Sequence, residues 1–525
     1  MSGWQNILNK SVFEVRQVLV DSKKIKYNLL IGSLGQIVTL LLGIVVPKLV
    51  LTNYGSEING LLSSVTNIYA YVALVEAGVA AASCQALYKA FANQSRDDIN
   101  SILAATNKYY HRTGFVYLLL ILTFAGIYPV FINTEIPYTT MVFVILFNGI
   151  GNVVNYFFHG KYLILLKADG KNYIRTGVEI FTTTFKQLSK IILIALGYNV
   201  VFVQFAAMLV SFIQMVYIVQ YIKRNYSWID LKVKPDFKAI SQSKNVFIHQ
   251  VNYLVVSNTD VVILTAFSNL KTVSIYSLYL LLVNMVDKVM HVIRDALEFK
   301  IANFFHTNKQ KFLKFFRMYE VYYICLAFAL YSVVDCFILP FLKLYTKGVN
   351  DINYIIWYLP FCFVITKLMA VVRYPYDAII HICGHFKQTQ ASSITESIIN
   401  IIISLLLVHK LGISGVLFGT VLAALYRVNY LVIYLHKNKI INRNIFSSYK
   451  TFFINFSLFI TLDFASGFVE FTYGSYIYIL VACIPYTFVV FLIYFAVNSV
   501  FEPQSFKELL VIIKNIIRKF RITKN

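Results

Sequence analysis

Asp260 is an acidic residue in the middle of an apolar run, 259–264, that has the composition of a membrane span. A carboxylate inside such a segment is costly unless it faces other helices or a wet cavity. We therefore expect Asp260 to face a bundle interior, either as a working group of a transport site or as a structural acid bonded to a neighbouring helix. The stretch from Val246 to Asn284 contains two such spans joined by a turn at 267–270, and it predicts a transport-like core.

Other charged residues also fall inside apolar segments when depth is counted at about 1.5 Å per residue. Those well inside are Lys186, Asp260, Asp287, Lys288, Lys367, Arg427 and Asp463, with Glu76, Lys190 and Arg373 nearer an interface. Each of these residues could belong to an interhelical ion pair. Bases outnumber acids at this depth, so pairing cannot neutralise all of them, whereas an anionic ligand could.

Signatures of soluble enzymes and of metal sites are absent from the sequence. It has no Gly-rich phosphate loop followed by Lys-Ser/Thr and no His-Glu-x-x-His. His381 and His385 are four apart, but Gly384 interrupts the helix between them and no carboxylate completes a ligand set. The six cysteines have no short paired spacing and are expected to be free thiols. We expect no catalytic residues, no metal and no cofactor.

The composition indicates a membrane protein with many spans. Hydrophobic residues make up 58% of the 525 residues and charged residues only 14%, a balance that a soluble domain could not bury. Segments of roughly 20 apolar residues predict about fourteen transmembrane helices. We place them near 27–52, 60–83, 113–131, 139–163, 174–197, 199–222, 246–267, 274–295, 319–340, 353–377, 391–409, 413–435, 451–470 and 476–499.

The net charge of +23 is explained by the distribution of Lys and Arg among the connecting segments. Alternate segments are rich in them, and the others carry only Lys271, Lys343, Lys347 and Lys410. Basic residues stay on the cytoplasmic side of a membrane. This alternation predicts that both termini are cytoplasmic and that the charge requires no nucleic-acid partner.

These elements predict two six-helix lobes around a central cavity, followed by two more helices. A six-plus-six repeat is how many transporters build a central site. Both ends also have apolar and basic residues at helical spacing, which is typical of helices lying on membrane lipids. The predicted parts are a cytoplasmic interfacial helix (1–26), an N-lobe (27–222), a cytoplasmic linker (223–245), a C-lobe (246–436), two further spans (451–500) and a cytoplasmic amphipathic tail (501–525).

Several short motifs resemble those of a known family. The first is an acid-x-Gly-apolar-Ala run at 76–82, with a Leu-Tyr-Lys end at 87–89 and a basic-aromatic loop at 109–112. Further along are a Thr-Asp-apolar run at 259–264, Tyr-Ser-x-Tyr at 276–279, and the runs at 395–404 and 412–420. Over most of residues 27–436 this resembles Wzx-type polysaccharide repeat-unit transporters of the multidrug/oligosaccharidyl-lipid/polysaccharide exporter superfamily. The chain departs from the family at Ala77, where Leu is more usual, and at Leu278, where Asn is common.

The resemblance implies a flippase in the bacterial cytoplasmic (inner) membrane. Its cargo would be an oligosaccharide on undecaprenyl pyrophosphate, moved by alternating access to the outer leaflet for surface polysaccharide assembly, with the polysaccharide polymerase and chain-length machinery as partners. The pyrophosphate is the anion that the excess bases could meet, so the expected cavity residues are Lys186, Lys288, Lys367, Arg373 and Arg427. Members are often described as ion-coupled, and the candidate ion carriers are Asp260, Glu76 and Glu396.

Two other functions remain open. A multidrug and toxin exporter of the same superfamily would share the helical core, but the basic excess and the two extra spans disfavour it. A membrane polysaccharide polymerase or glycosyltransferase would keep its catalytic residues in a large hydrophilic external loop, and no external segment is long enough for one.

Overall fold

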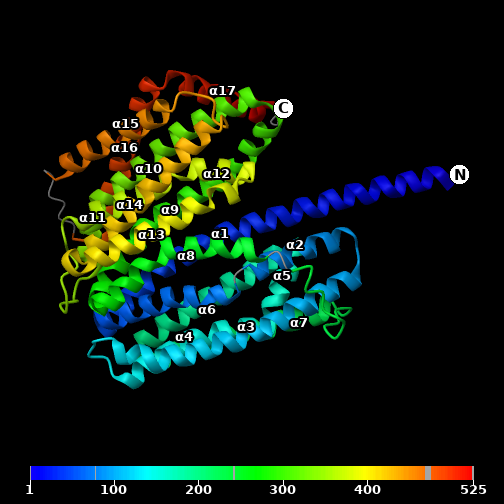
Figure 1. The fold of residues 1–525 in the computed structure, drawn as a ribbon, viewed down its shortest axis with the longest axis horizontal. Coiled ribbons are helices and arrows are strands. Elements are labelled where there is room, and N and C mark those ends of the chain that lie inside the picture. The colour runs from blue at the N-terminus through cyan, green and yellow to red at the C-terminus, as the bar shows by residue number, and fades with distance from the viewer. Residues whose placement is uncertain (1, 77, 241–242, 468–473, 523–525) are drawn as a thin grey trace. The chain divides into compact units, whose positions relative to one another are not determined.

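The computed structural model describes residues 2–76, 78–240, 243–467 and 474–522, and within them all side chains except those of 2–34, 36–37, 243–250, 253, 516–517 and 519–522. In this part of the chain every regular element is helical (Figure 1). An apolar chain in lipid must satisfy its backbone polar groups within each segment, and the helix does so. The prediction of an all-α integral membrane protein is confirmed.

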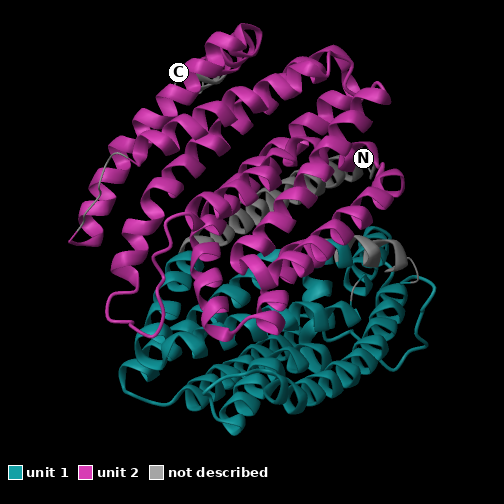
Figure 2. Cartoon of the chain, turned by 60° about the vertical axis from the view of Figure 1, so that its left-hand side comes forward, with its two compact units in different colours: residues 1–254 teal, residues 255–525 magenta. Residues whose placement is uncertain are grey.

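The chain forms two compact units, residues 1–254 and 255–525 (Figure 2). Their boundary falls inside α8 (Ser243–Phe267). Unit 1 also contains α1 (Ser2–Val72), a 3₁₀ turn (Ala73–Glu76), α2 (Val79–Ala92), α3 (Arg96–Phe131), α4 (Tyr138–Val154), a π-helical turn (Asn155–His159), α5 (Gly160–Ala168), α6 (Asn172–Ala195) and α7 (Val200–Asn225). The predicted linker at 223–245 lies a few residues before this boundary, and the division into transport lobes stays a prediction.

Unit 2 continues from the second part of α8 through nine more helices. They are α9 (Leu270–Thr307), α10 (Lys309–Tyr345), α11 (Leu359–Val372), α12 (Tyr374–Cys383), α13 (Phe386–Leu411), α14 (Ile413–Lys437), α15 (Phe446–Ser466), α16 (Tyr476–Phe501) and α17 (Pro503–Ile522). α10 packs against α9, α11, α15 and α16 and is the most deeply buried of the long helices. It therefore forms the centre of this unit.

Ten helices in the described part of the chain are long and apolar enough to cross a membrane. Each of the fourteen predicted ranges nevertheless overlaps a helix. The first two predicted ranges, 27–52 and 60–83, both fall largely on α1. Together with the 3₁₀ turn that follows, α1 contains one candidate span, Val38–Glu76. The other three predicted spans fall on α6, α8 and α15. The described residues of these helices are not long and apolar enough to count as candidate spans.

α1 changes direction at Gly55. Gly55 has φ 82° and ψ 177°, a backbone conformation that glycine adopts at no steric cost. α1 therefore consists of two helical parts that meet at this residue. The side chains of the predicted surface helix at 1–26 lie outside the described ones, so its position on a membrane stays a prediction.

α13 and α14 pack closely because small residues lie between them. A Cβ added at Gly415 would come within 2.6 Å of the Leu407 carbonyl oxygen, and one at Gly419 would meet Ser404. Small residues allow helix backbones to approach each other inside a membrane. This contact sets the spacing of Asn400 and Thr420, which belong to the site described next.

Candidate functional site

Asp260 lies at the centre of a buried polar group in unit 2 and is 4% exposed. Tyr276 on α9 donates its hydroxyl to Asp260 Oδ2 at 2.8 Å. The Thr420 hydroxyl on α14 lies 3.0 Å from both carboxylate oxygens. The carboxylate therefore links three helices through hydroxyl donors.

Asn400 on α13 extends this group. Its Nδ2 donates to Thr420 Oγ1 at 2.8 Å, whereas its Oδ1 is buried without a hydrogen-bond partner. Ser404, one turn further along α13, donates to the Val416 carbonyl at 3.2 Å. Carboxylate, amide and hydroxyl oxygens together suit a hard cation, and the carboxylate alone suits a proton.

Lys367 and Asp287 form a second charged group in the same unit. The Lys367 ammonium lies 3.9 Å from Asp287 Oδ2. Tyr374 donates to Asp287 Oδ1 at 2.9 Å and lies 2.9 Å from His291 Nε2. Lys367 is also within electrostatic range of Asp260. This predicted cavity residue therefore lies between two acids.

Arg373, Arg427 and Glu396 form a third charged group. Arg373 lies 2.8 Å from Asp377 and 2.5 Å from Glu396, and Arg427 Nε lies 3.7 Å from the other oxygen of Glu396. Arg427 also donates to the Thr389 carbonyl at 3.0 Å. Both guanidinium groups are thus held by carboxylates, as in the ion-pair alternative considered above, and Glu396 is their shared partner.

Lys288, the remaining predicted cavity base of unit 2, belongs to none of these groups. Its side chain is exposed on α9. No ion pair or hydrogen bond of this side chain is present among the described residues.

Glu76 closes the 3₁₀ turn of unit 1. It accepts a hydrogen bond from Tyr110 on α3 and lies within electrostatic range of Arg175 on α6. Tyr109 donates to the Val75 carbonyl at 3.4 Å. Two adjacent tyrosines of the basic-aromatic loop motif therefore hold the turn that carries this acid.

Lys186 lies in a group of bases in unit 1 that contains no acid. Lys190 follows it by one turn of α6 and interacts with it electrostatically. His159 lies within electrostatic range of both Lys161 and Lys186. We call Lys161, Lys186, Lys190 and His159 the basic cluster.

Two members of the basic cluster are buried and two are half-buried, and its ammonium groups have no carboxylate partner among the described residues. Lys161 is 6% exposed and His159 2% exposed, and His159 Nδ1 has no hydrogen-bond partner. In the part of the chain that the structure describes, none of the three ammonium groups pairs with a carboxylate. Burial of like charges is unfavourable without an opposite charge, so this group is suited to an anionic ligand.

Three members of the basic cluster, Lys161, Lys190 and His159, were not predicted as site residues. Lys161 falls at the end of the predicted span 139–163, but the helix continues through α5 to Ala168 and buries it. His159 ends the π-helical turn, a local feature without a signal in the hydrophobic pattern. The contacts of Asp260 with Asn400 and Thr420 also could not be predicted, because they join distant segments.

No protein-family profile and no curated protein matches this sequence. Solved structures do match in fold. The lipid II flippase MurJ in an inward closed conformation has a TM-score of 0.67 at 12% identity, covering 92% of this chain and 100% of MurJ. An inward-facing multidrug resistance MATE family transporter of the MOP superfamily has a TM-score of 0.63 at 13% identity, covering 77% and 96%. The Vibrio cholerae MATE transporter VcmN has 0.55 at 12%, covering 81% and 99%.

The chain has the fold of MurJ and the MATE transporters. At these identities the likeness concerns the fold alone. The MurJ and MATE fold accommodates both a flippase and multidrug transporters, so the side chains must distinguish between the functions.

Proposed function

We propose that this chain is a Wzx-type flippase that moves oligosaccharide linked to undecaprenyl pyrophosphate across the bacterial cytoplasmic membrane by alternating access. Both termini are cytoplasmic in this proposal, and the polysaccharide polymerase and chain-length machinery receive the product. The basic cluster carries the proposal. A pyrophosphate that leaves water needs charged donors along its path, and Lys161, Lys186 and Lys190 are bases without competing carboxylates.

In this proposal the anion contacts lie in unit 1 rather than in unit 2. Lys367, Arg373 and Arg427 already have carboxylate partners, so an anion would have to compete with those acids. Of the predicted cavity bases, Lys186 has buried basic neighbours and no acid. The likeness to a lipid II flippase supports a lipid-linked cargo for this fold.

We assign ion coupling to the Asp260 group. Its carboxylate, the Thr420 hydroxyl and the unpartnered Asn400 amide oxygen offer oxygen ligands from three helices. A small cation or a proton bound there would change the charge that links these helices. Glu76 and Glu396 are less suited, since Glu396 holds two arginines.

Multidrug export is the second candidate, because MATE transporters share the fold. A cationic drug requires an acidic lining. The buried Asp260 and the half-buried Glu76 already accept hydrogen bonds, and the basic cluster would repel a cation. Resistance to cationic drugs without restored polysaccharide in a host lacking its own flippase would favour this second function.

The test is complementation of a flippase-deficient strain, with surface polysaccharide and trapped lipid-linked precursor read together. Losing one charge-assisted contact costs about 1.5–3 kcal/mol, roughly ten- to a hundredfold in binding. We expect Lys186→Gln and Lys190→Gln, and more strongly their combination, to accumulate precursor on the cytoplasmic leaflet at normal membrane levels of protein.

Lys410→Gln provides the matched control, because it removes the same charge from an exposed position that was not predicted to line the cavity. It should complement like the parent chain. Parent-level polysaccharide from Gln variants at all three lysines of the basic cluster, singly and in pairs, would contradict an anion path there.

A further inference from the structure

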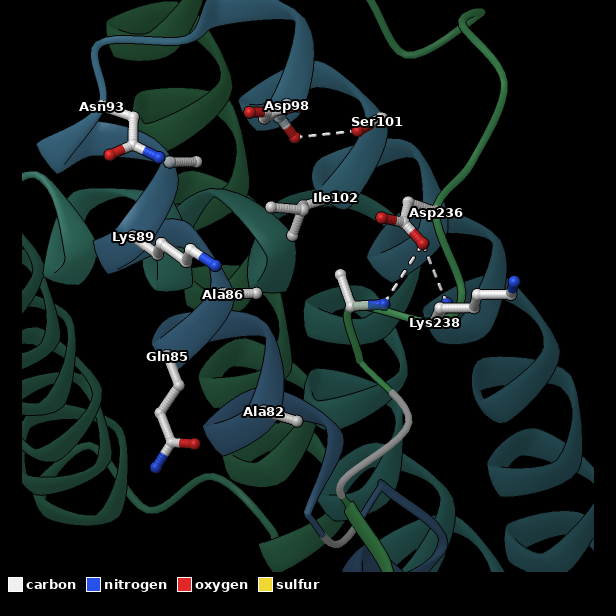
Figure 3. A pocket seen from close by; sticks show the side chains of 12 residues that line it. Ala82, Gln85, Ala86, Lys89, Asn93, Asp98, Ser101, Ile102, Asp236 and Lys238 are labelled. Carbon is white, nitrogen blue, oxygen red and sulfur yellow. Dashed lines mark hydrogen bonds between the residues drawn. The ribbon is translucent and has the colours of Figure 1, made fainter.

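Unit 1 contains a pocket of about 490 Å³ between α2, the start of α3 and the loop that follows α7 (Figure 3). Small-molecule sites typically occupy about 300–1,000 Å³. None of the acids and bases assigned a role above lines this pocket. The pocket therefore shares no residue with the basic cluster or with the Asp260 group.

The loop wall of the pocket is held in place by hydrogen bonds to α3. Asp236 N donates to the Ser101 carbonyl at 3.1 Å. Asn100 is bonded twice, accepting from Asp230 N at 3.2 Å and donating to the Trp228 carbonyl at 3.4 Å. A hydrophilic loop fixed at several points forms a preorganised wall.

The α2 wall presents exposed polar side chains. Gln85, Lys89 and Asn93 are spaced four apart and share one helical face. None of the three side chains has a hydrogen bond or ion pair with another described residue. The face beside them is made of small residues, Ala82, Ala86 and Ala90, which leave room for a ligand above the helix.

The charges around the pocket disfavour a simple anion. Asp98 lines it, and so does Asp236, whose Oδ1 accepts from the backbone N–H groups of Lys238 and Ala239 at 2.9 and 3.2 Å. Figure 3 shows the Lys238 side chain running away from α2, which leaves Lys89 facing the two acids. An anion would be repelled by both carboxylates.

A simple cation is also a poor match. It would satisfy the carboxylates but leave the N–H donors of Lys89, Gln85 and Asn93 unused. A hydroxyl group both donates and accepts, so a ligand with many hydroxyls can satisfy amides, ammonium and carboxylate at once. A saccharide has this chemistry.

We propose that this pocket binds the glycan part of the lipid-linked substrate, apart from its pyrophosphate. The inference rests on the proposed function, because it takes the transported molecule as the source of the saccharide. A glycan held there would let the protein select its cargo by sugar structure, whereas the basic cluster meets the pyrophosphate common to all such lipids.

The experiment measures protection of a thiol inside the pocket. The full-length Ala86→Cys variant is reacted with a maleimide, and labelling is read at each site by mass spectrometry. The probe is the free oligosaccharide released by mild acid from the host's own lipid-linked precursor, and sodium pyrophosphate is the comparison. We expect the glycan to slow labelling at position 86 about fivefold once it is about four times above its Kd, and pyrophosphate to have no effect.

The matched control is Tyr88→Cys on the same helix, since Tyr88 is 47% exposed and does not line the pocket. Its labelling should not respond to glycan. Protection by pyrophosphate alone, equal protection at both positions, or no protection at millimolar glycan would each overturn the saccharide site.

Complementation by the unmodified chain separates this inference from the proposed function. If the chain complements a flippase-deficient strain but glycan does not protect position 86, the saccharide site is wrong and the function stands. If glycan protects but the chain does not complement, the site stands and the flippase function is wrong.

Discussion

The charged groups described above have different neighbours in the two units. In unit 2 each buried guanidinium lies beside a carboxylate, as Arg373 and Arg427 do beside Glu396. In unit 1, Lys186 and Lys190 lie beside each other instead. Removing one partner of a buried pair is costly because the other charge is left uncompensated. Substitutions of Arg373, Arg427 or Glu396 therefore affect folding as well as function, whereas those at Lys186 and Lys190 report on ligand binding.

Asp260→Asn separates the charge of this residue from its packing. An amide oxygen can accept from Tyr276, and its N–H₂ can donate to Thr420, whose hydroxyl then turns to the Val416 carbonyl 3.2 Å away. We expect little change in melting temperature but loss of transport and of its ion dependence. The measurements are polysaccharide complementation and thermal unfolding of the purified protein.

Tyr276→Phe is the complementary change, because it keeps the Asp260 charge and removes one donor to it. A buried acceptor that loses its donor costs about 1–3 kcal/mol, so this variant should unfold earlier and still show ion-dependent transport. Transport by Asp260→Asn at the parent level would show that the charge is not needed.

At the scale of elements, the α13–α14 contact positions the Asp260 group. Asn400 and Thr420 meet because Gly415 and Gly419 bring the two helices together. A larger residue there must push backbone against backbone, since the nearest atoms to a Cβ at Gly415 are the carbonyl group of Leu407.

Gly415→Ala should therefore destabilise the protein by about 1–3 kcal/mol, the usual cost of overpacking, and reduce transport by separating Asn400 from Thr420. The measurement is thermal unfolding together with complementation. Gly126→Ala on α3 is the control, because no atom lies within 4 Å of its added Cβ. If both alanine variants unfold at the parent temperature, the close contact does not hold these helices.

At the scale of the whole molecule, the alternation of Lys and Arg predicts orientation in the membrane. Ser227 follows α7 in a basic loop, and Gly474 precedes α16 in a segment without Lys or Arg. Basic segments stay in the cytoplasm. Ser227→Cys should react with an impermeant thiol reagent only after the cells are opened, whereas Gly474→Cys should react in intact cells.

The labelling needs a background without the six native cysteines. Reaction of Ser227→Cys in intact cells would show that the orientation is the opposite of the predicted one. The pocket of unit 1 would then open on the other side of the membrane. Because the proposed cargo is made in the cytoplasm, that outcome would also count against a saccharide site there.

The sequence alone determined the helical membrane class of this protein, the approximate positions of its spans and the presence of a buried acid at Asp260. These properties follow from local composition, because a chain in lipid must satisfy its backbone within each segment. The boundaries of the long helices were less well predicted, since α3 and α9 extend beyond the apolar segments that the hydrophobic pattern reveals.

Only the tertiary structure decided which charges have partners. Glu396 is separated from Arg373 and Arg427 by many residues, and helical depth does not show which way a side chain points. The same holds for Lys161 and His159, which join Lys186 because α5 packs on α6. Electrostatic interactions depend on distances across the bundle, and these distances are set by helix packing that no short stretch of sequence encodes.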